Sequence, residues 1–174
     1  MTAETIAAAL GWVGFVLAVS WPLFRSRTGM LAAQLGVCVL FTGHYALIGA
    51  MTGAWLNALS GMQAAAAVPL ATRPQFRWVY LATIPVIATV MVASWQGLAS
   101  AAAAVAMTIV SLGRWQIAPD RLRLFMALSV PFWFTHNALV GSLPGMVADT
   151  CTGAVLLVII LRDWRARRGV DTRR

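Results

Sequence analysis

Lysine is absent from this 174-residue chain, and acidic residues are scarce, with Asp and Glu together numbering 5. All 13 basic residues are therefore arginines, and the formal net charge is +8. Only 10% of the residues are charged while 60% are hydrophobic, which excludes an ordinary soluble domain. In so apolar a chain, an arginine excess indicates orientation in a membrane rather than a face that binds nucleic acid. The composition predicts an all-α integral membrane protein with no nucleic-acid partner.

Residues that could carry covalent or metal chemistry are also few. The only two cysteines, Cys38 and Cys151, fall inside apolar segments, which favours buried thiols over a disulfide. A metal site needs three or four converging ligands, and two His, one Asp and two distant Cys do not have that spacing. No Ser-His-Asp pattern with an elbow motif and no glycine-rich phosphate loop is present. The sequence therefore favours a protein that is not an enzyme and that uses neither a metal nor a cofactor.

A duplication organises the chain, because residues 44–61 return 92 positions later as residues 136–153. Each copy is typical of the end of one apolar helix, a glycine-bounded turn and the start of the next helix. Asn57 of the first copy aligns with Asp149 of the second. The identical pairs are His44 and His136, Ala46 and Ala138, Leu47 and Leu139, Gly49 and Gly141, Gly53 and Gly145, and Gly61 and Gly153.

Seven apolar segments have about the length that crosses a bilayer, which takes about 20 residues. They cover residues 5–24, 30–50, 54–70, 77–95, 98–112, 122–141 and 145–161. The first lacks the basic flank of a signal peptide and is expected to be retained. At the offset of 92, the first three segments overlie the last three. We therefore expect a first three-helix repeat at 1–71, a linker helix at 72–97, a second three-helix repeat at 98–162 and an arginine-rich cytoplasmic tail at 163–174. Because one span separates two units of three, the units are expected to be parallel.

The arginines fall only after the first, third, fifth and seventh segments, and the other connections have none. By the positive-inside rule, the N-terminus is expected outside and the C-terminus in the cytoplasm. The arginines of the tail are expected to contact anionic lipid headgroups. The four groups are Arg25 and Arg27; Arg73 and Arg77; Arg114, Arg121 and Arg123; and Arg162, Arg165, Arg167, Arg168, Arg173 and Arg174.

The repeated hairpins hold the candidate site. His44 and Asn57 are centred on their turn, so on antiparallel helices they are expected to lie at similar depth and to face each other, as are His136 and Asp149. A carboxylate inside a membrane span is costly and by default marks a functional site. The alternative is that the glycines four residues from Asn57 and Asp149, and a His bonded to an amide, only pack helices together.

The residues Phe-Thr-Gly-His at 41–44 with Asn57, and Trp-Phe-Thr-His at 133–136 with Asp149, resemble the second and third helices of the SWEET, SemiSWEET and PQ-loop transporters. The hairpins are similar, more narrowly, to those of the bacterial inner-membrane YgjV family. The resemblance implies a seven-helix 3-1-3 fold in the bacterial inner membrane and transport of a small polar solute such as a sugar. The implied substrate-facing residues are Asn57, Asp149, His44, His136, Trp133, Asn137 and Tyr45. The implied hinge or packing residues are Gly49, Gly53, Gly61, Gly141, Gly145, Gly153, Pro22 and Pro131.

The sequence is also consistent with other solutes and other functions. The nicotinamide riboside permeases of the PnuC type share the 3-1-3 plan, so a heterocyclic vitamin is a competing solute. Asp149 departs from the asparagine of the transporter pattern, and Pro22 has no counterpart in the second repeat. The main alternative is a non-transporting receptor or assembly protein whose polar hairpins hold helices together, and a weaker one is a membrane enzyme that acts on lipid. A homo-oligomer is consistent with each of these functions.

Overall fold

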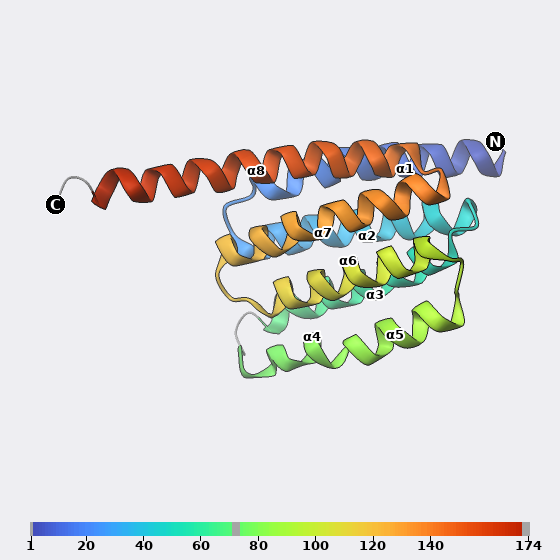
Figure 1. The fold of residues 1–174 in the computed structure, drawn as a ribbon, viewed down its shortest axis with the longest axis horizontal. Helices are drawn as coiled ribbons and strands as arrows, with labels where there is room; N and C mark the ends of the chain where they lie inside the picture. The colour runs from blue at the N-terminus through green and yellow to red at the C-terminus, as the bar shows by residue number, and fades with distance from the viewer. Residues whose placement is uncertain (1, 71–73, 172–174) are drawn as a thin grey trace.

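The computed structural model describes residues 2–70 and 74–171, and every regular element in these ranges is helical. The helices lie side by side, and the two ends of the chain lie at opposite ends of the bundle (Figure 1). This confirms the all-α class, whereas Arg73, Arg173 and Arg174 lie outside the described residues. The elements are α1 Ala3–Ser20, the 3-10 turn η1 Trp21–Leu23, α2 Arg27–Leu47, α3 Met51–Leu70, the 3-10 turn η2 Pro74–Arg77, α4 Trp78–Ala82, α5 Ile84–Ala93, α6 Leu98–Trp115, α7 Pro119–Val140 and α8 Leu143–Asp171.

The outer surface of the bundle is apolar. Val13, Val16, Val39, Val92 and Val158 are each more than half exposed. Such a surface is stable against lipid rather than water. Among the described residues, four helical stretches are long and apolar enough to cross a membrane, and α4 with α5 makes a shorter apolar stretch; the count of seven spans stays a prediction. The four are Ala3–Leu23, Arg27–Leu47, Leu98–Trp115 and Leu143–Arg167.

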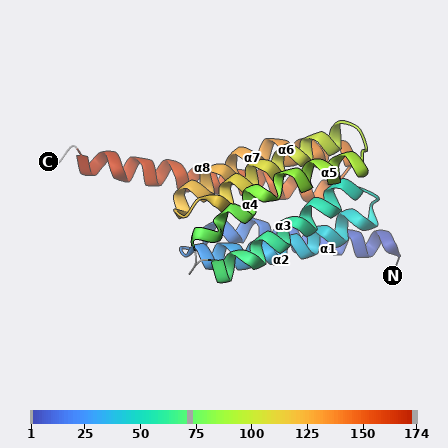
Figure 2. The same ribbon diagram turned by 90° about the horizontal axis from the view of Figure 1, so that it is seen from below.

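The helices form two groups of three. Helix α2 packs against both α1 and α3, and α7 packs against both α6 and α8. The groups meet where α1 lies against α8 and where α3 lies against α6 (Figures 1 and 2). Helices α4 and α5 pack on α6 at the side of the bundle. A shared apolar core joins the groups, because Leu56 of α3, Met107 of α6 and Leu156 of α8 belong to one buried cluster.

The two groups repeat one another at the 92-residue offset. Helices α3 and α8 begin at Met51 and Leu143, and the glycines before them, Gly49 and Gly141, have φ angles of +78° and +73°. Glycine adopts this left-handed conformation without the steric cost that other residues incur. The amides that follow these glycines donate to Tyr45 O and Asn137 O, each at 2.9 Å. The turns of the two hairpins are therefore built alike.

The predicted linker helix at 77–95 is broken at Thr83 into α4 and α5. Pro85 is the second residue of α5, has no N–H to donate and would clash with the carbonyl four residues before it in a continuous helix. The Thr83 hydroxyl donates to Tyr80 O at 2.6 Å, which satisfies a carbonyl near the end of α4. The connection between the two groups is therefore a kinked helix.

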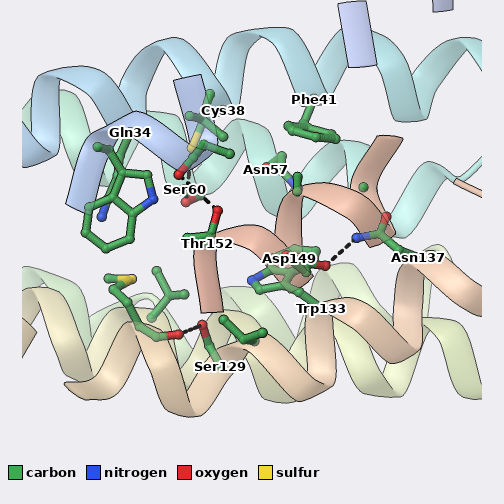
Figure 3. Close-up of a pocket in the computed structure, with 18 of the residues that line it drawn as sticks. Gln34, Cys38, Phe41, Asn57, Ser60, Ser129, Trp133, Asn137, Asp149 and Thr152 are labelled. Carbon is green, nitrogen blue, oxygen red and sulfur yellow. Dashed lines mark hydrogen bonds between the residues drawn. The ribbon is translucent and has the colours of Figure 1, made fainter. Parts of the chain in front are cut away.

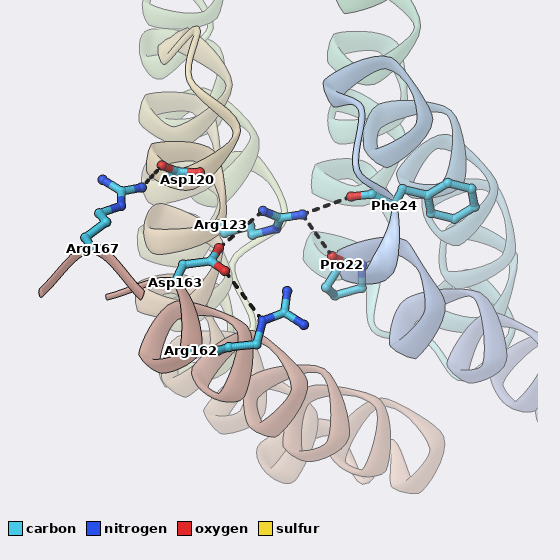
Figure 4. Close-up of polar contacts among 7 residues, drawn as sticks. All are labelled: Pro22, Phe24, Asp120, Arg123, Arg162, Asp163 and Arg167. Carbon is cyan, nitrogen blue, oxygen red and sulfur yellow. Dashed lines mark hydrogen bonds and ion pairs between the residues drawn. The ribbon is translucent and has the colours of Figure 1, made fainter. Parts of the chain in front are cut away.

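The predicted last span and tail form one continuous helix, α8, which projects beyond the bundle (Figure 1). Arginine is a good helix former, so the basic residues after 161 continue the helix. Figure 4 shows how the base of this projection is held: Asp163 pairs with Arg123 and Arg162, and Arg167 pairs with Asp120. Ion pairs near the surface contribute about 0–1 kcal/mol each.

Candidate functional site

A cavity of about 120 Å³ lies between the two groups of helices (Figure 3). It is large enough for several water molecules. Most of its lining residues form pairs at the 92-residue offset, so both groups present the same positions to it. These pairs are Ala18 and Val110, Gln34 and Met126, Val37 and Ser129, Cys38 and Val130, Phe41 and Trp133, Tyr45 and Asn137, Asn57 and Asp149, and Ser60 and Thr152.

Tyr45 and Asn137 locate the axis that relates the two groups. They are equivalent positions, and the Tyr45 hydroxyl donates to Asn137 Oδ1 at 2.8 Å. When equivalent residues of two repeats contact each other, the approximate two-fold axis passes between them. The cavity therefore lies on this axis, where transporters built from repeats place their substrate sites.

Asp149 and Asn57 occupy equivalent walls of the cavity and differ in their partners. Asn137 Nδ2 donates to Asp149 Oδ2 at 2.7 Å, so both ends of the Asn137 amide are fixed, by Tyr45 and by Asp149. Asn57 Nδ2 donates to Gly53 O of its own helix at 3.1 Å, and no described residue contributes a hydrogen bond to its Oδ1. One Asp149 oxygen and the Asn57 carbonyl are thus free to accept hydrogen bonds from a solute.

The predicted pairing of each histidine with the polar residue across its turn is wrong. His44 Nδ1 contacts Ala7 O at 2.8 Å and His136 Nδ1 contacts Ala99 O at 2.9 Å, and neither ring lines the cavity. Because a carbonyl only accepts, Nδ1 carries the proton in both rings. Ala7 and Ala99 are also 92 positions apart, so these bonds extend the repeat to α1 and α6. The histidines fasten the first helix of each group to the second.

The second ring nitrogens differ between the repeats. His44 Nε2 accepts from the Ser142 hydroxyl at 2.8 Å, and Ser142 Oγ also accepts from Gly145 N at 3.2 Å. His136 Nε2 is buried without a hydrogen-bond partner. The position equivalent to Ser142 is Ala50, which has no hydroxyl. The alanine at position 50 thus explains the unsatisfied nitrogen.

Four of the predicted glycines are places of close helix approach. A Cβ on Gly53 would lie 2.5 Å from His136 Nε2, and one on Gly145 would overlap the Asn137 amide. Gly61 approaches Cys38 and Gly153 approaches Val130, at 3.3 and 3.1 Å for an added Cβ. Pro22 is buried in η1 and Pro131 lies inside α7, so both are well placed for a hinge, which stays a prediction.

The predicted placement of Arg114 in a connection after the fifth span is wrong. Helix α6 continues to Trp115, and the Arg114 side chain is only 2% exposed and lines the cavity. Its Nη1 donates to Ser60 O at 2.9 Å and to Gln63 Oε1 at 3.0 Å. Its Nη2 donates to Gln34 Oε1 at 3.1 Å.

A signal for Arg114 was present in the sequence. Ser100, Met107, Ser111 and Arg114 are spaced by seven, four and three residues, which places them on one helix face. All four are nearly or fully buried in the structure. The predicted segment ended at Leu112, two residues before the last member of this face, so Arg114 was placed in the connection.

The described part of the chain contains no group of three or more His, Cys, Asp or Glu side chains that could hold a metal ion. The cavity instead offers one carboxylate, one guanidinium, amides, hydroxyls and four aromatic side chains. Such a set can bind a small polar solute by hydrogen bonds and ring contacts.

Comparison with known proteins identifies a family for this chain. Residues 5–167 match the Imp-YgjV family, described as bacterial inner membrane proteins. No curated protein and no solved structure matches the chain. The match covers both hairpins, all of the cavity and most of α8. The chain therefore belongs to the YgjV family of bacterial inner membrane proteins.

Proposed function

We propose that this protein transports a small polar solute along one pathway between its two three-helix groups. The observation that carries the proposal is the cavity on the axis between the repeats, lined by equivalent positions and containing the carboxylate of Asp149. Rocking of one group against the other about such a site exposes it to each side of the membrane in turn.

The proposed architecture is the SWEET-like 3-1-3 arrangement with seven spans. It is supported by the parallel course of α1 and α6, and by the position of the chain ends at opposite ends of the bundle (Figure 1). The proposed orientation places the N-terminus outside, because the connections at the C-terminal end of the bundle carry the arginines while Glu4 lies at the other end. The described arginines in those connections and helix ends are Arg25, Arg27, Arg77, Arg121 and Arg123.

The lining favours a solute that has both hydrogen-bonding groups and a flat or apolar face. Phe41 and Trp133 stand on equivalent walls, and Asn57 and Asp149 lie near them (Figure 3). Aromatic rings beside fixed hydrogen-bonding groups suit a sugar ring or a heterocycle. The proposal includes no enzymatic step and no cofactor.

An assembly protein is the second candidate, and the histidine and glycine contacts favour it. His44, His136, Gly53 and Gly145 all serve helix packing. Asp149 does not fit this function well, because placing a carboxylate inside the membrane costs free energy and this one does not join α8 to the other group of helices.

A screen of sugars, nucleosides and vitamins for thermal stabilisation of the purified protein in detergent separates the two candidates, because a bound solute stabilises the fold by mass action. The transporter proposal expects a solute that stabilises the wild type, no response in Asn57→Ala and Asp149→Ala, and uptake of that solute into proteoliposomes. Thr150→Ala is the control, since Thr150 is the exposed neighbour of Asp149. Folded variants that bind the solute as the wild type does would remove both residues from the site.

A further inference from the structure

Arg114 carries a charge that no described carboxylate balances. Its partners are neutral oxygens of Ser60, Gln63 and Gln34, and the described ion pairs do not include it. Guanidinium groups stay charged in proteins, and an intramembrane charge is retained where it has a function. Neutral hydrogen-bonding residues could hold α2, α3 and α6 together without this cost, so packing alone does not account for an arginine.

The donors of Arg114 are also incompletely used. Its Nε is buried without a partner, and Nη2 gives only one of its two hydrogens, to Gln34. Gln34 Nε2 is likewise buried without a partner. The orientation of the Gln34 amide is set by Arg114, because only its oxygen can accept from a guanidinium. Within the described chain, these are the two residues that both line the cavity and have an unsatisfied buried donor.

The arginine lies at the opposite end of the cavity from the carboxylate. Arg114 is sixteen residues into α6 and Asp149 is six residues into α8, and both helices begin at the same end of the bundle. At 1.5 Å per residue the two positions are separated by about 15 Å along the bundle. Gln34 and Ser60 lie toward one side of the cavity in Figure 3, and Asp149 with Asn137 toward the other. An anionic group at Arg114 is therefore kept away from Asp149.

We infer that Arg114 and Gln34 form an oxyanion subsite that binds the carboxylate of a small solute in the cavity. The flat edge of a guanidinium presents two parallel N–H groups that match the two oxygens of a carboxylate, and the Gln34 amide adds a third donor. The bound carboxylate supplies the counter-charge that Arg114 lacks and accepts from the unsatisfied Nε of Arg114 and Nε2 of Gln34. The inference rests on the proposed function only in that a solute enters the cavity.

Propionate and propionamide are the probes, because they have nearly the same shape and differ in charge. Binding is measured by thermal stabilisation in detergent at constant ionic strength set with chloride. We expect propionate to stabilise the wild type and propionamide to have at least about tenfold weaker affinity, since hydrogen bonds between charged groups are roughly twice as strong as neutral ones. Arg114→Gln should lose the response to propionate. Arg25→Gln should keep the response to propionate, because Arg25 is exposed and its substitution removes the same charge at a site away from the cavity.

Equal responses to the two probes, or an unchanged propionate response in Arg114→Gln, would overturn the subsite. A stronger response to inorganic phosphate than to propionate would overturn the carboxylate assignment. If Arg114→Gln does not fold, the ¹⁵Nε signal of Arg114 in the wild type decides: it should shift on addition of propionate, and a signal that stays in place refutes the inference. Anion binding without uptake in proteoliposomes would support the subsite and refute the transporter proposal. Uptake of a neutral solute without anion binding would support the transporter proposal and refute the subsite.

Discussion

Ala50→Ser should stabilise the protein, although it places a polar group in a buried turn. Ala50 is 2% exposed and is the residue before α3, equivalent to Ser142 before α8. In the second repeat, the Ser142 hydroxyl accepts from Gly145 N and donates to His44 Nε2. In the first repeat, Gly53 lies directly against His136 Nε2. A hydroxyl at position 50 that caps Gly53 N therefore meets the unsatisfied nitrogen as well.

Two contributions set the size of the effect. Replacing alanine by serine at a helix N-cap stabilises by about 0.5–2 kcal/mol. A hydrogen bond to a buried group that lacked one contributes about 1 kcal/mol. Together they predict a gain of about 2 kcal/mol for Ala50→Ser. The reverse change, Ser142→Ala, should cost a similar amount, because it removes the cap and leaves His44 Nε2 without a donor.

The free energy of unfolding is measured in detergent by denaturant titration of the wild type, both single variants and a double-mutant cycle with His136→Ala. The cycle isolates the contribution of the histidine. About half of the gain from Ala50→Ser should disappear when His136 is absent. A neutral or destabilising Ala50→Ser, or a gain that does not depend on His136, would refute the equivalence of the two turns.

Three further predictions concern topology, charge and packing. A cysteine at Leu143 should react with an impermeant thiol reagent from outside and one at Ala118 only from the cytoplasm; the reverse pattern would overturn the orientation. Asp149→Asn should keep the fold, because an amide oxygen also accepts from Asn137, and should reduce the pH dependence of solute binding, because it removes the one carboxylate that lines the cavity. An unchanged pH profile would make Asp149 a passive contact. Gly145→Ala should displace the Asn137 amide and lower the free energy of unfolding by about 1–3 kcal/mol in the same titration. A substitution with no effect on stability would contradict the close contact.

Much of the structure of the two hairpins was predictable, because glycines and polar residues recur in both repeats at the same spacing. Both turns have a glycine because the backbone at Gly49 and Gly141 has a left-handed φ angle. The placement of Asn57 and Asp149 on equivalent walls of one cavity agrees with their alignment in the sequence. The match of α1 to α6 was hard to see in the sequence, because alanines such as Ala7 and Ala99 are common in so apolar a chain and the repeated contact is made by their backbone carbonyls.

The errors have a common physical origin. Sequence spacing does not determine the direction of the His44 and His136 rings, which depends on how α1 and α6 pack across α2 and α7. Arg114 was assigned to a connection because the predicted span ended at Leu112, whereas its hydrogen-bond partners Gln34 and Gln63 come from helices far away in the sequence. Long-range hydrogen bonding decides such positions, and a single sequence does not display it.

The central claim is that the cavity between the repeats is a pathway for solute. Cys38 tests it, because its thiol lines the cavity, is 5% exposed and becomes the single cysteine in Cys151→Ser. In right-side-out and inside-out membrane vesicles, a small water-soluble thiol reagent should reach Cys38 from both sides, and a transported solute should slow the reaction. A thiol that stays unreactive from both sides of the native membrane, and reacts only after unfolding, would show a sealed cavity and contradict the pathway.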